Sequence, residues 1–182
     1  NTVSGNYIGT DATGTADLGN TWSGVYISDG AQNNTVGPGN VIAYNGSDGV
    51  EVMGGSTTGN PITQNSIFSN TLGINLTHGA NGGIGAPVIV TTTLGSVNVV
   101  GTACPNCTVE LFENGDTDGE GESYVGDTTA DLGGVFTVTV DFLSDSYLTA
   151  TATDEASGTS EFSAVFTTTV SGAPPTERIY LP

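Results

Sequence analysis

The sequence predicts an all-β protein in two parts, a short parallel β-helix of about three coils followed by an immunoglobulin-like (Ig-like) antiparallel β-sandwich. Short apolar motifs recur about every 25 residues in the first part, and strand-like runs separated by turn signals fill the second. No window has the apolar spacing of a helix. Gly, Thr, Ser and Asn are abundant, and these residues favour turns and strands.

Residues 1–79 are predicted to form the coils, with three short strands in each. The third strand recurs with offsets of 25 and 24 residues at Gly24–Ile27, Gly49–Val52 and Gly73–Leu76. Because side chains alternate along a strand, equivalent apolar residues should stack in inward-facing ladders, and corner asparagines should stack beside them. The expected ladders are Val25/Val50/Ile74, Ile8/Ile42/Ile67 and Asn20/Asn45/Asn70, and the other two strands begin at Asn1, Asn34 and Asn60 and at Asn6, Asn40 and Asn65.

The segment Asn6–Thr15 (Asn-Tyr-Ile-Gly-Thr-Asp-Ala-Thr-Gly-Thr), together with Gly39–Ile42 and Gly49–Val50, resembles the right-handed parallel β-helix repeats of large bacterial surface proteins. The resemblance covers residues 1–76 and implies a right-handed coil and an extracellular setting, but no activity. Thr10–Gly19 is an insertion in the first coil and should loop out. Thr151–Ser163 also looks like the closing hairpin of the Ig-like modules that follow such β-helices.

The second half of the chain changes character after a Gly-rich joint at residues 80–86, which could be flexible or packed against the coil end. Residues 87–170 are predicted to form the β-sandwich from about seven strands. These are Val88–Thr93, Val97–Thr102, Val109–Glu113, Tyr124–Thr129, Val135–Asp141, Leu148–Thr153 and Phe162–Val170. Residues 171–182 are expected to form an extended tail that ends on an apolar patch, Ile179, Tyr180 and Leu181.

The net charge is −18, with 19 acidic residues against one arginine and no lysine. A nucleic acid or an anionic membrane surface would be repelled, and no apolar run is long enough for membrane insertion, whereas divalent cations would be attracted. One acidic loop offers oxygen ligands at alternate positions, but Val125 stands where an EF-hand needs Glu. The loop is therefore a loose Ca²⁺ site or a solvated turn, and no other cofactor is required. Its ligands would be Asn114, Asp116, Asp118, Glu120 and Glu122.

The two cysteines, Cys104 and Cys107, are expected to form a short loop disulfide in an oxidising, extracellular compartment, with two free thiols as the alternative. A zinc site would need further ligands, and the only histidine is His78. The start of the chain in the middle of a repeat suggests a mature fragment. Four Asn-x-Ser/Thr motifs could carry glycans, although several are expected by chance in this composition. They begin at Asn33, Asn45, Asn75 and Asn106.

We expect no catalytic activity. Lyases of this fold need a basic residue, and Arg178 is the only arginine, while Asp48 and Glu51, the closest acidic pair, are explained as a corner residue and a solvent-facing one. The leading prediction is an extracellular structural protein that assembles head-to-tail with copies of itself, because the first coil has no polar cap. The contacts expected are Asn1, Val3 and Ile8 with Ile179, Tyr180 and Leu181. The alternative is an adhesin or glycan-binding fragment with a sugar-stacking face formed by Tyr7, Trp22, Tyr26 and Tyr44.

Overall fold

The computed structural model describes residues 1–93, 97–140 and 147–168. Within them the chain is all-β, as predicted, with sixteen strands and one short 3₁₀ turn, η1 (Ala80–Gly83). No helix in the described part is long and apolar enough to cross a membrane.

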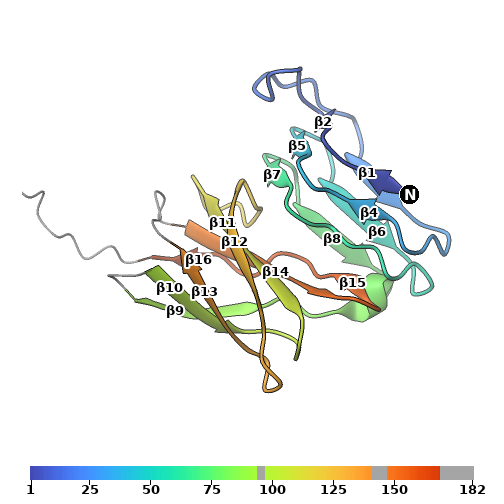
Figure 1. The fold of residues 1–182 in the computed structure, drawn as a ribbon. Helices are drawn as coiled ribbons and strands as arrows, with labels where there is room; N and C mark the ends of the chain where they lie inside the picture. The colour runs from blue at the N-terminus through green and yellow to red at the C-terminus, as the bar shows by residue number, and fades with distance from the viewer. Residues whose placement is uncertain (94–96, 141–146, 169–182) are drawn as a thin grey trace, which may run out of the picture.

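The first eight strands form three parallel sheets, and the chain passes through the three sheets in turn (Figure 1). We call residues 1–79 the coil region and one passage through the three sheets a coil. The sheet orders are β1-β4, β2-β5-β7 and β3-β6-β8. The strands are β1 (Thr2–Val3), β2 (Tyr7–Ile8), β3 (Val25–Ile27), β4 (Thr35–Val36), β5 (Val41–Ala43), β6 (Val50–Met53), β7 (Ser66–Phe68) and β8 (Ile74–Thr77).

The predicted apolar ladders are confirmed by the strand registers. Val25 pairs with Val50 and Val50 with Ile74, and the Ile8/Ile42/Ile67 ladder pairs in the same way. Along β3, Ile27 is buried while Tyr26 is exposed, which is the alternation that places apolar residues inside. The inserted Thr10–Gly19 loop projects from one edge of the coils (Figure 1) and is closed by bonds from three backbone amides to Asp11 Oδ1.

The Gly-rich joint packs against the coil end, which was one of the two predicted alternatives. Ala80 and Asn81 are fully buried. The Asn81 side chain accepts a bond from the Asn60 N–H and donates to the carbonyl oxygens of Asn60 and Thr159. The joint is therefore a fixed part of the coil end.

Residues 87–168, which we call the antiparallel region, form two antiparallel sheets around one apolar core. One sheet has the order β13-β10-β9; the other has the order β12-β11-β14-β15, with β16 also paired to β14. The core includes Val99, Leu111, Phe136 and Leu148. The strands are β9 (Val88–Thr93), β10 (Val97–Thr102), β11 (Thr108–Asn114), β12 (Ser123–Thr129), β13 (Val135–Val140), β14 (Tyr147–Asp154), β15 (Gly158–Thr159) and β16 (Phe166–Thr167).

The predicted strand Phe162–Val170 is wrong over most of its length, because only β16 is a strand there and residues 169–170 lie outside the described residues. Before β16 the chain follows β14 through serine side chains. The hydroxyl oxygens of Ser160 and Ser163 accept bonds from the Ala152 and Ala150 amides. Asp141, the predicted end of β13, and the 171–182 tail also lie outside the described residues.

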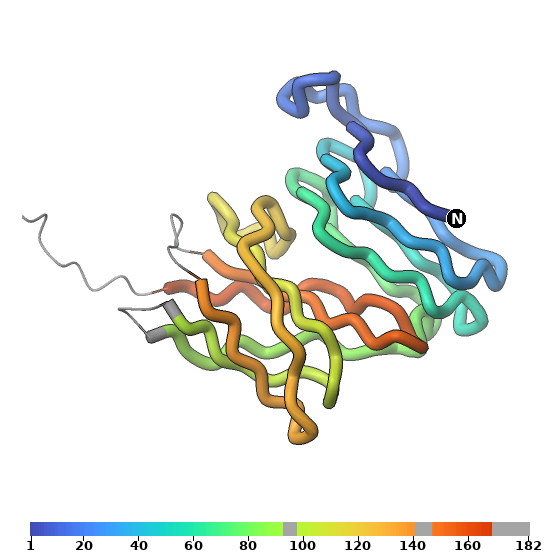
Figure 2. Tube along the Cα trace, in the orientation of Figure 1, coloured from blue at the N-terminus to red at the C-terminus, as the bar shows by residue number. Residues whose placement is uncertain are grey.

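The antiparallel region lies against one end of the coil region. Figure 2 shows the segment around β15 running along the coil end that carries η1, while the N-terminus lies on the far side of the coils. Isolated bridges join Asn60 to Gly158 and Ile67 to Gly121 across this boundary. The two ends of the coil region therefore have different surroundings.

Candidate functional site

Three ladders of asparagine side chains run through the coil region. In the Asn20–Asn45–Asn70 ladder, Asn45 Oδ1 accepts bonds from the backbone N–H of Asn20 (3.3 Å) and from its Nδ2 (2.8 Å), and Asn70 Oδ1 accepts the same pair from Asn45. An amide side chain is both donor and acceptor, so identical residues can stack in this way, whereas carboxylates cannot. The other two ladders are Asn1–Asn34–Asn60 and Asn6–Asn40–Asn65.

The ladder that begins at Asn20 ends on a carboxylate from the antiparallel region. The backbone N–H and the Nδ2 of Asn70 donate to the two oxygens of Glu120, at 2.9 and 3.0 Å. Glu120 is only 1% exposed. It occupies the position of a fourth rung and accepts both bonds from Asn70, and the ladder ends there.

A second glutamate closes the neighbouring corner of the coils. Thr63 Oγ1 donates to one oxygen of Glu110 and the Gln64 N–H donates to the other at 3.0 Å. Glu110 is buried on β11, on the side of the antiparallel region that faces the coils. The first asparagine ladder ends on Asn81 of the joint. Two of the three ladders thus end on a side chain from outside the coils, Asn81 and Glu120, while Glu110 binds Thr63 and Gln64 just before Asn65, the last rung of the third ladder.

Burial controls the ionisation of both glutamates. Desolvation raises the pKa of Glu120 from 4.5 to about 7, against the lowering effect of the bonds from Asn70, and Asp118 nearby raises it further. Desolvation also raises the pKa of Glu110, again opposed by hydrogen bonds from the coils. The two carboxyl groups therefore hold protons more tightly in the folded chain than in the unfolded one.

The sheet edges at this end are also covered. Ile67 on β7 exchanges two backbone bonds with Gly121, at 2.8 and 3.0 Å. The Ile62 N–H donates to Thr159 Oγ1, and the Leu76 N–H donates to Glu161 Oε1. We call this surface the capped end, because every sheet of the coil region finds partners there.

An aromatic side chain seals the apolar core at the capped end. Phe162 packs against the coil core and meets Phe112 edge to face, with ring centroids 5.4 Å apart. A Cβ atom at Gly73 or at Gly121 would lie 2.6 Å or 2.4 Å from the Phe162 ring. The two glycines therefore make the space that this ring fills.

The opposite surface, which we call the open end, consists of the edge strands β1, β2 and β3. Val3, Ile8 and Val25 lie there half-buried, and Ile8 and Val25 pack against the coil core, as Phe162 does at the capped end. Val3 and Val25 also line an open cavity of ≈ 360 Å³. Among the described residues, no donor reaches the Oδ1 atoms of the first rungs, Asn1, Asn6 and Asn20.

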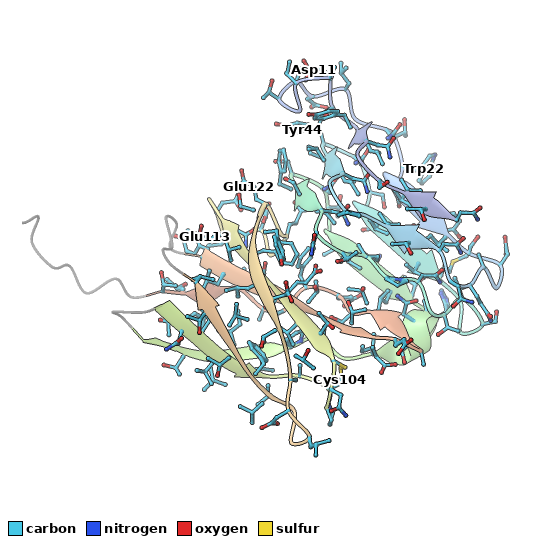
Figure 3. All side chains as sticks on the ribbon, in the orientation of Figure 1. Asp11, Trp22, Tyr44, Cys104, Glu113 and Glu122 are labelled. Carbon is cyan, nitrogen blue, oxygen red and sulfur yellow. A yellow bond between two sulfur atoms is a disulfide. The ribbon has the colours of Figure 1, made fainter. Side chains whose placement is uncertain are left out.

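The four aromatic residues predicted to form one sugar-stacking face lie in separate places. Trp22 and Tyr26 line a common cavity with Ser23 and Glu51. Tyr44 instead packs edge to face on Phe68 and donates a hydrogen bond to Thr15 O. Figure 3 places Tyr44 beside the Asp11 loop and away from Trp22.

Tyr7 also lies outside the Trp22 cavity, on β2, where its ring lies beside Gly14 of the inserted loop. The predicted face therefore reduces to Trp22 and Tyr26.

The predicted calcium loop does not bring three of its acidic side chains together. No group of three or more acidic, His or Cys side chains suited to a metal ion is found in the described part of the chain. Asp116, Asp118 and Glu122 accept bonds from backbone amides of their own loop, and Asn114 Oδ1 accepts the Glu122 N–H. Glu120 is turned inward to Asn70. Calcium binding by this loop stays a prediction.

The disulfide between Cys104 and Cys107 is confirmed, with the two Cα atoms 5.4 Å apart in the turn between β10 and β11 (Figure 3). Disulfides are typical of an oxidising environment outside the cytoplasm.

The Asn-x-Ser/Thr motifs differ in access. Asn33 and Asn106 are exposed, and Asn75 is half-buried with its Nδ2 donating to Asp48 Oδ2. Asn45 is 3% exposed and its Nδ2 bonds to Asn70 Oδ1, so the structure argues against glycan attachment at Asn45.

No protein-family model and no curated protein sequence matches this chain.

Sequence reasoning found the asparagine ladders but missed the residues that end them. Glu110 and Glu120 come from the antiparallel region, about 50 residues after their coil partners, and follow no period. The signal that could have found Glu120 was its place in the calcium-like loop, where it was predicted as a ligand. Asn81 could have been found as a fourth asparagine of the Asn1–Asn34–Asn60 series, because it follows Asn60 by 21 residues.

Proposed function

We propose that this chain is a non-catalytic structural protein of the cell surface that assembles head-to-tail with copies of itself. In this proposal the coil region is a short right-handed parallel β-helix and the antiparallel region is an Ig-like β-sandwich. The parallel registers at offsets of 24 to 34 residues support the first assignment, and two antiparallel sheets around one core support the second. The right-handedness of the β-helix is inferred from the family resemblance.

The observation that carries the proposal is the difference between the two coil ends. At the capped end, residues of the same chain bond to all three sheets, end two of the asparagine ladders, and bind Gln64 beside the third. At the open end, no strand of the described residues pairs with the outer edges of β1, β2 and β3, where Val3, Ile8 and Val25 lie half-buried. A stack of coils needs a cap or a continuation at each end, and unpaired strand edges attract further strands.

We assign a second copy as the occupant of the open end. The two surfaces in such a contact would be different parts of the chain, so the contact repeats and yields a filament unless it closes into a ring. The sequence-based candidate for the covering segment is the tail with Ile179, Tyr180 and Leu181, which lies outside the described residues.

Within the described residues, β9 offers a second edge, with Val88 and Val90 59% and 60% exposed. Figure 1 places β9 on the side of the molecule remote from the N-terminus, as a head-to-tail contact requires.

The non-catalytic part of the proposal rests on what the buried carboxylates do. Glu110 and Glu120 accept hydrogen bonds from the coils, and Asp48 accepts one from Asn75. The position of each of these three carboxylates is therefore explained by its hydrogen bonds within the fold. The surface location rests on the disulfide and on the family resemblance.

The test is light scattering combined with electron microscopy over a range of protein concentrations. We expect polymers for the wild-type chain and monomers for Val3→Lys, because a charge on an edge strand opposes further pairing. Val135→Lys is the matched control, since Val135 is an exposed valine on β13, and it should polymerise like the wild type. Monodisperse wild-type monomers at high concentration, without fibres, would refute the proposal.

A chain that ends at residue 170 locates the covering segment. Loss of polymers in this truncated chain assigns the contact to the tail. If polymers persist, β9 is the segment that covers the open end, and Val90→Lys should then abolish the polymers.

A further inference from the structure

Trp22 and Tyr26 form an exposed aromatic pair beside a carboxylate. Trp22 is 77% exposed and Tyr26 52% exposed. With Ser23 and Glu51 they line an open cavity of ≈ 420 Å³ on the outer face of the β3-β6-β8 sheet. Ligand pockets for small molecules typically have volumes of about 300–1,000 Å³ and combine aromatic walls with a few fixed polar groups.

Sheet geometry explains why these residues meet. Tyr26 is the outward residue of β3, and Glu51 is its partner in register on β6. Trp22 lies in the turn that leads into β3, and Val25 and Ile27 already supply the inward residues of that strand. The coil core therefore does not use Trp22 or Tyr26, and fold stability does not explain two large exposed rings at this place.

The polar side of the cavity is held in place. Ser23 Oγ donates a hydrogen bond to Glu51 Oε2 at 2.9 Å, which leaves the other carboxylate oxygen available as an acceptor. The Tyr26 hydroxyl lies 3.4 Å from Met53 Sδ, on the same strand as Glu51. An oriented carboxylate beside aromatic faces can accept bonds from ligand hydroxyl groups while the rings cover the apolar C–H face of a sugar.

Charge narrows the class of ligand. The chain carries −18 in total, and its single arginine, Arg178, lies in the tail, so a uronate, a sulfated sugar or a phosphate would meet repulsion from Glu51. We infer that the Trp22–Ser23–Tyr26–Glu51 cavity is a binding site for neutral saccharide units. This site adjoins the open end, because Tyr26 lies on β3 and lines both cavities, whereas Trp22, Ser23 and Glu51 line only this one.

The single tryptophan of the chain makes a direct assay possible, because all indole fluorescence comes from Trp22. The experiment titrates the full chain with neutral oligosaccharides (cellopentaose, maltopentaose, xylopentaose and chitopentaose) and records Trp22 emission. We expect a saturable blue shift with at least one of them. Binding should weaken about tenfold in Tyr26→Ala, which removes one stacking face, and several-fold in Glu51→Gln.

Tyr7→Ala is the matched control, because Tyr7 is also 52% exposed but lies on β2, outside the cavity. It should bind like the wild type. The site is refuted if no oligosaccharide gives a saturable shift, or if Tyr26→Ala and Tyr7→Ala change the affinity equally. Saturation by tetramethylammonium in place of the sugars would also overturn the inference, since an aromatic pair with a carboxylate would then be a cation site.

Discussion

Asn45 is the middle rung of its ladder, and it forms hydrogen bonds to both neighbouring rungs, Asn20 and Asn70. Its Oδ1 accepts two bonds from Asn20 and its Nδ2 donates to Asn70. We expect Asn45→Ala to lower the free energy of unfolding by about 2 kcal/mol, because buried hydrogen-bonding groups lose their partners. Asn20→Ala, at the exposed end of the same ladder, should cost less than ~1 kcal/mol. Urea unfolding followed by circular dichroism measures both, and equal losses would contradict the account.

Glu120 should make stability fall as pH rises. Its pKa is about 7 in the folded chain against 4.5 as its ordinary value. The folded state therefore holds this proton more tightly, so the stabilising effect is complete below pH 4.5 and is lost as pH rises to about 7. The difference between these two pKa values corresponds to a change in the free energy of unfolding of up to roughly 3 kcal/mol. Glu120→Gln should remove the contribution of Glu120 and leave that of Glu110, so the variant should become more stable relative to the wild type as pH rises from 4 to 8.

The control for this prediction is Glu155→Gln, the same replacement at an exposed glutamate of the antiparallel region. Unfolding free energies measured at pH 4, 6 and 8 decide the matter. If Glu120→Gln and the wild type show the same slope, the buried carboxyl group does not titrate as described.

The strands of the coil region depend on glycines that precede them. A Cβ atom at Gly49 would lie 2.7 Å from both Gly73 O and Ile67 Cγ2. We expect Gly49→Ala to destabilise the chain by roughly 2 kcal/mol or more, because neither the stacked backbone nor the core can give way without strain. Gly85→Ala is the control, since no atom lies within 4 Å of its Cβ position, and it should be neutral or slightly stabilising. Midpoints of urea unfolding for the two variants test the difference.

At the scale of the element, periodic features could be predicted from the sequence and non-periodic ones could not. The Val25/Val50/Ile74 ladder follows from alternation and a constant offset, so its register could be derived from the residues alone. The capped end breaks the period, because Glu110 and Glu120 come from β11 and from the loop after it.

The predicted strand at Phe162 failed for a related reason. An alternating apolar pattern there does not reveal that Phe162 fills a space between Gly73 and Gly121 instead of continuing a sheet. The Trp22 cavity could not be predicted in full for the same reason. Tyr7 and Tyr44 were predicted to share one face with Trp22, but they lie beside the inserted loop.

At the scale of the whole molecule, the central feature is the difference between the capped end and the open end of the coil region. The antiparallel region binds one end of the coils through buried glutamates, backbone bonds and Phe162. At the other end, β1, β2 and β3 each keep one edge unpaired among the described residues. In the proposed head-to-tail assembly, a different part of the next copy covers this open end, which is the geometry of a linear polymer.

Hydrogen–deuterium exchange at low and high protein concentration tests this claim most directly, because it locates the contact as well as detecting it. We predict that amides of β1, β2 and β3 gain protection as concentration rises, while those of β7, which already pair with Gly121 at the capped end, do not change. Exchange at β1, β2 and β3 that stays fast at every concentration would contradict assembly through the open end.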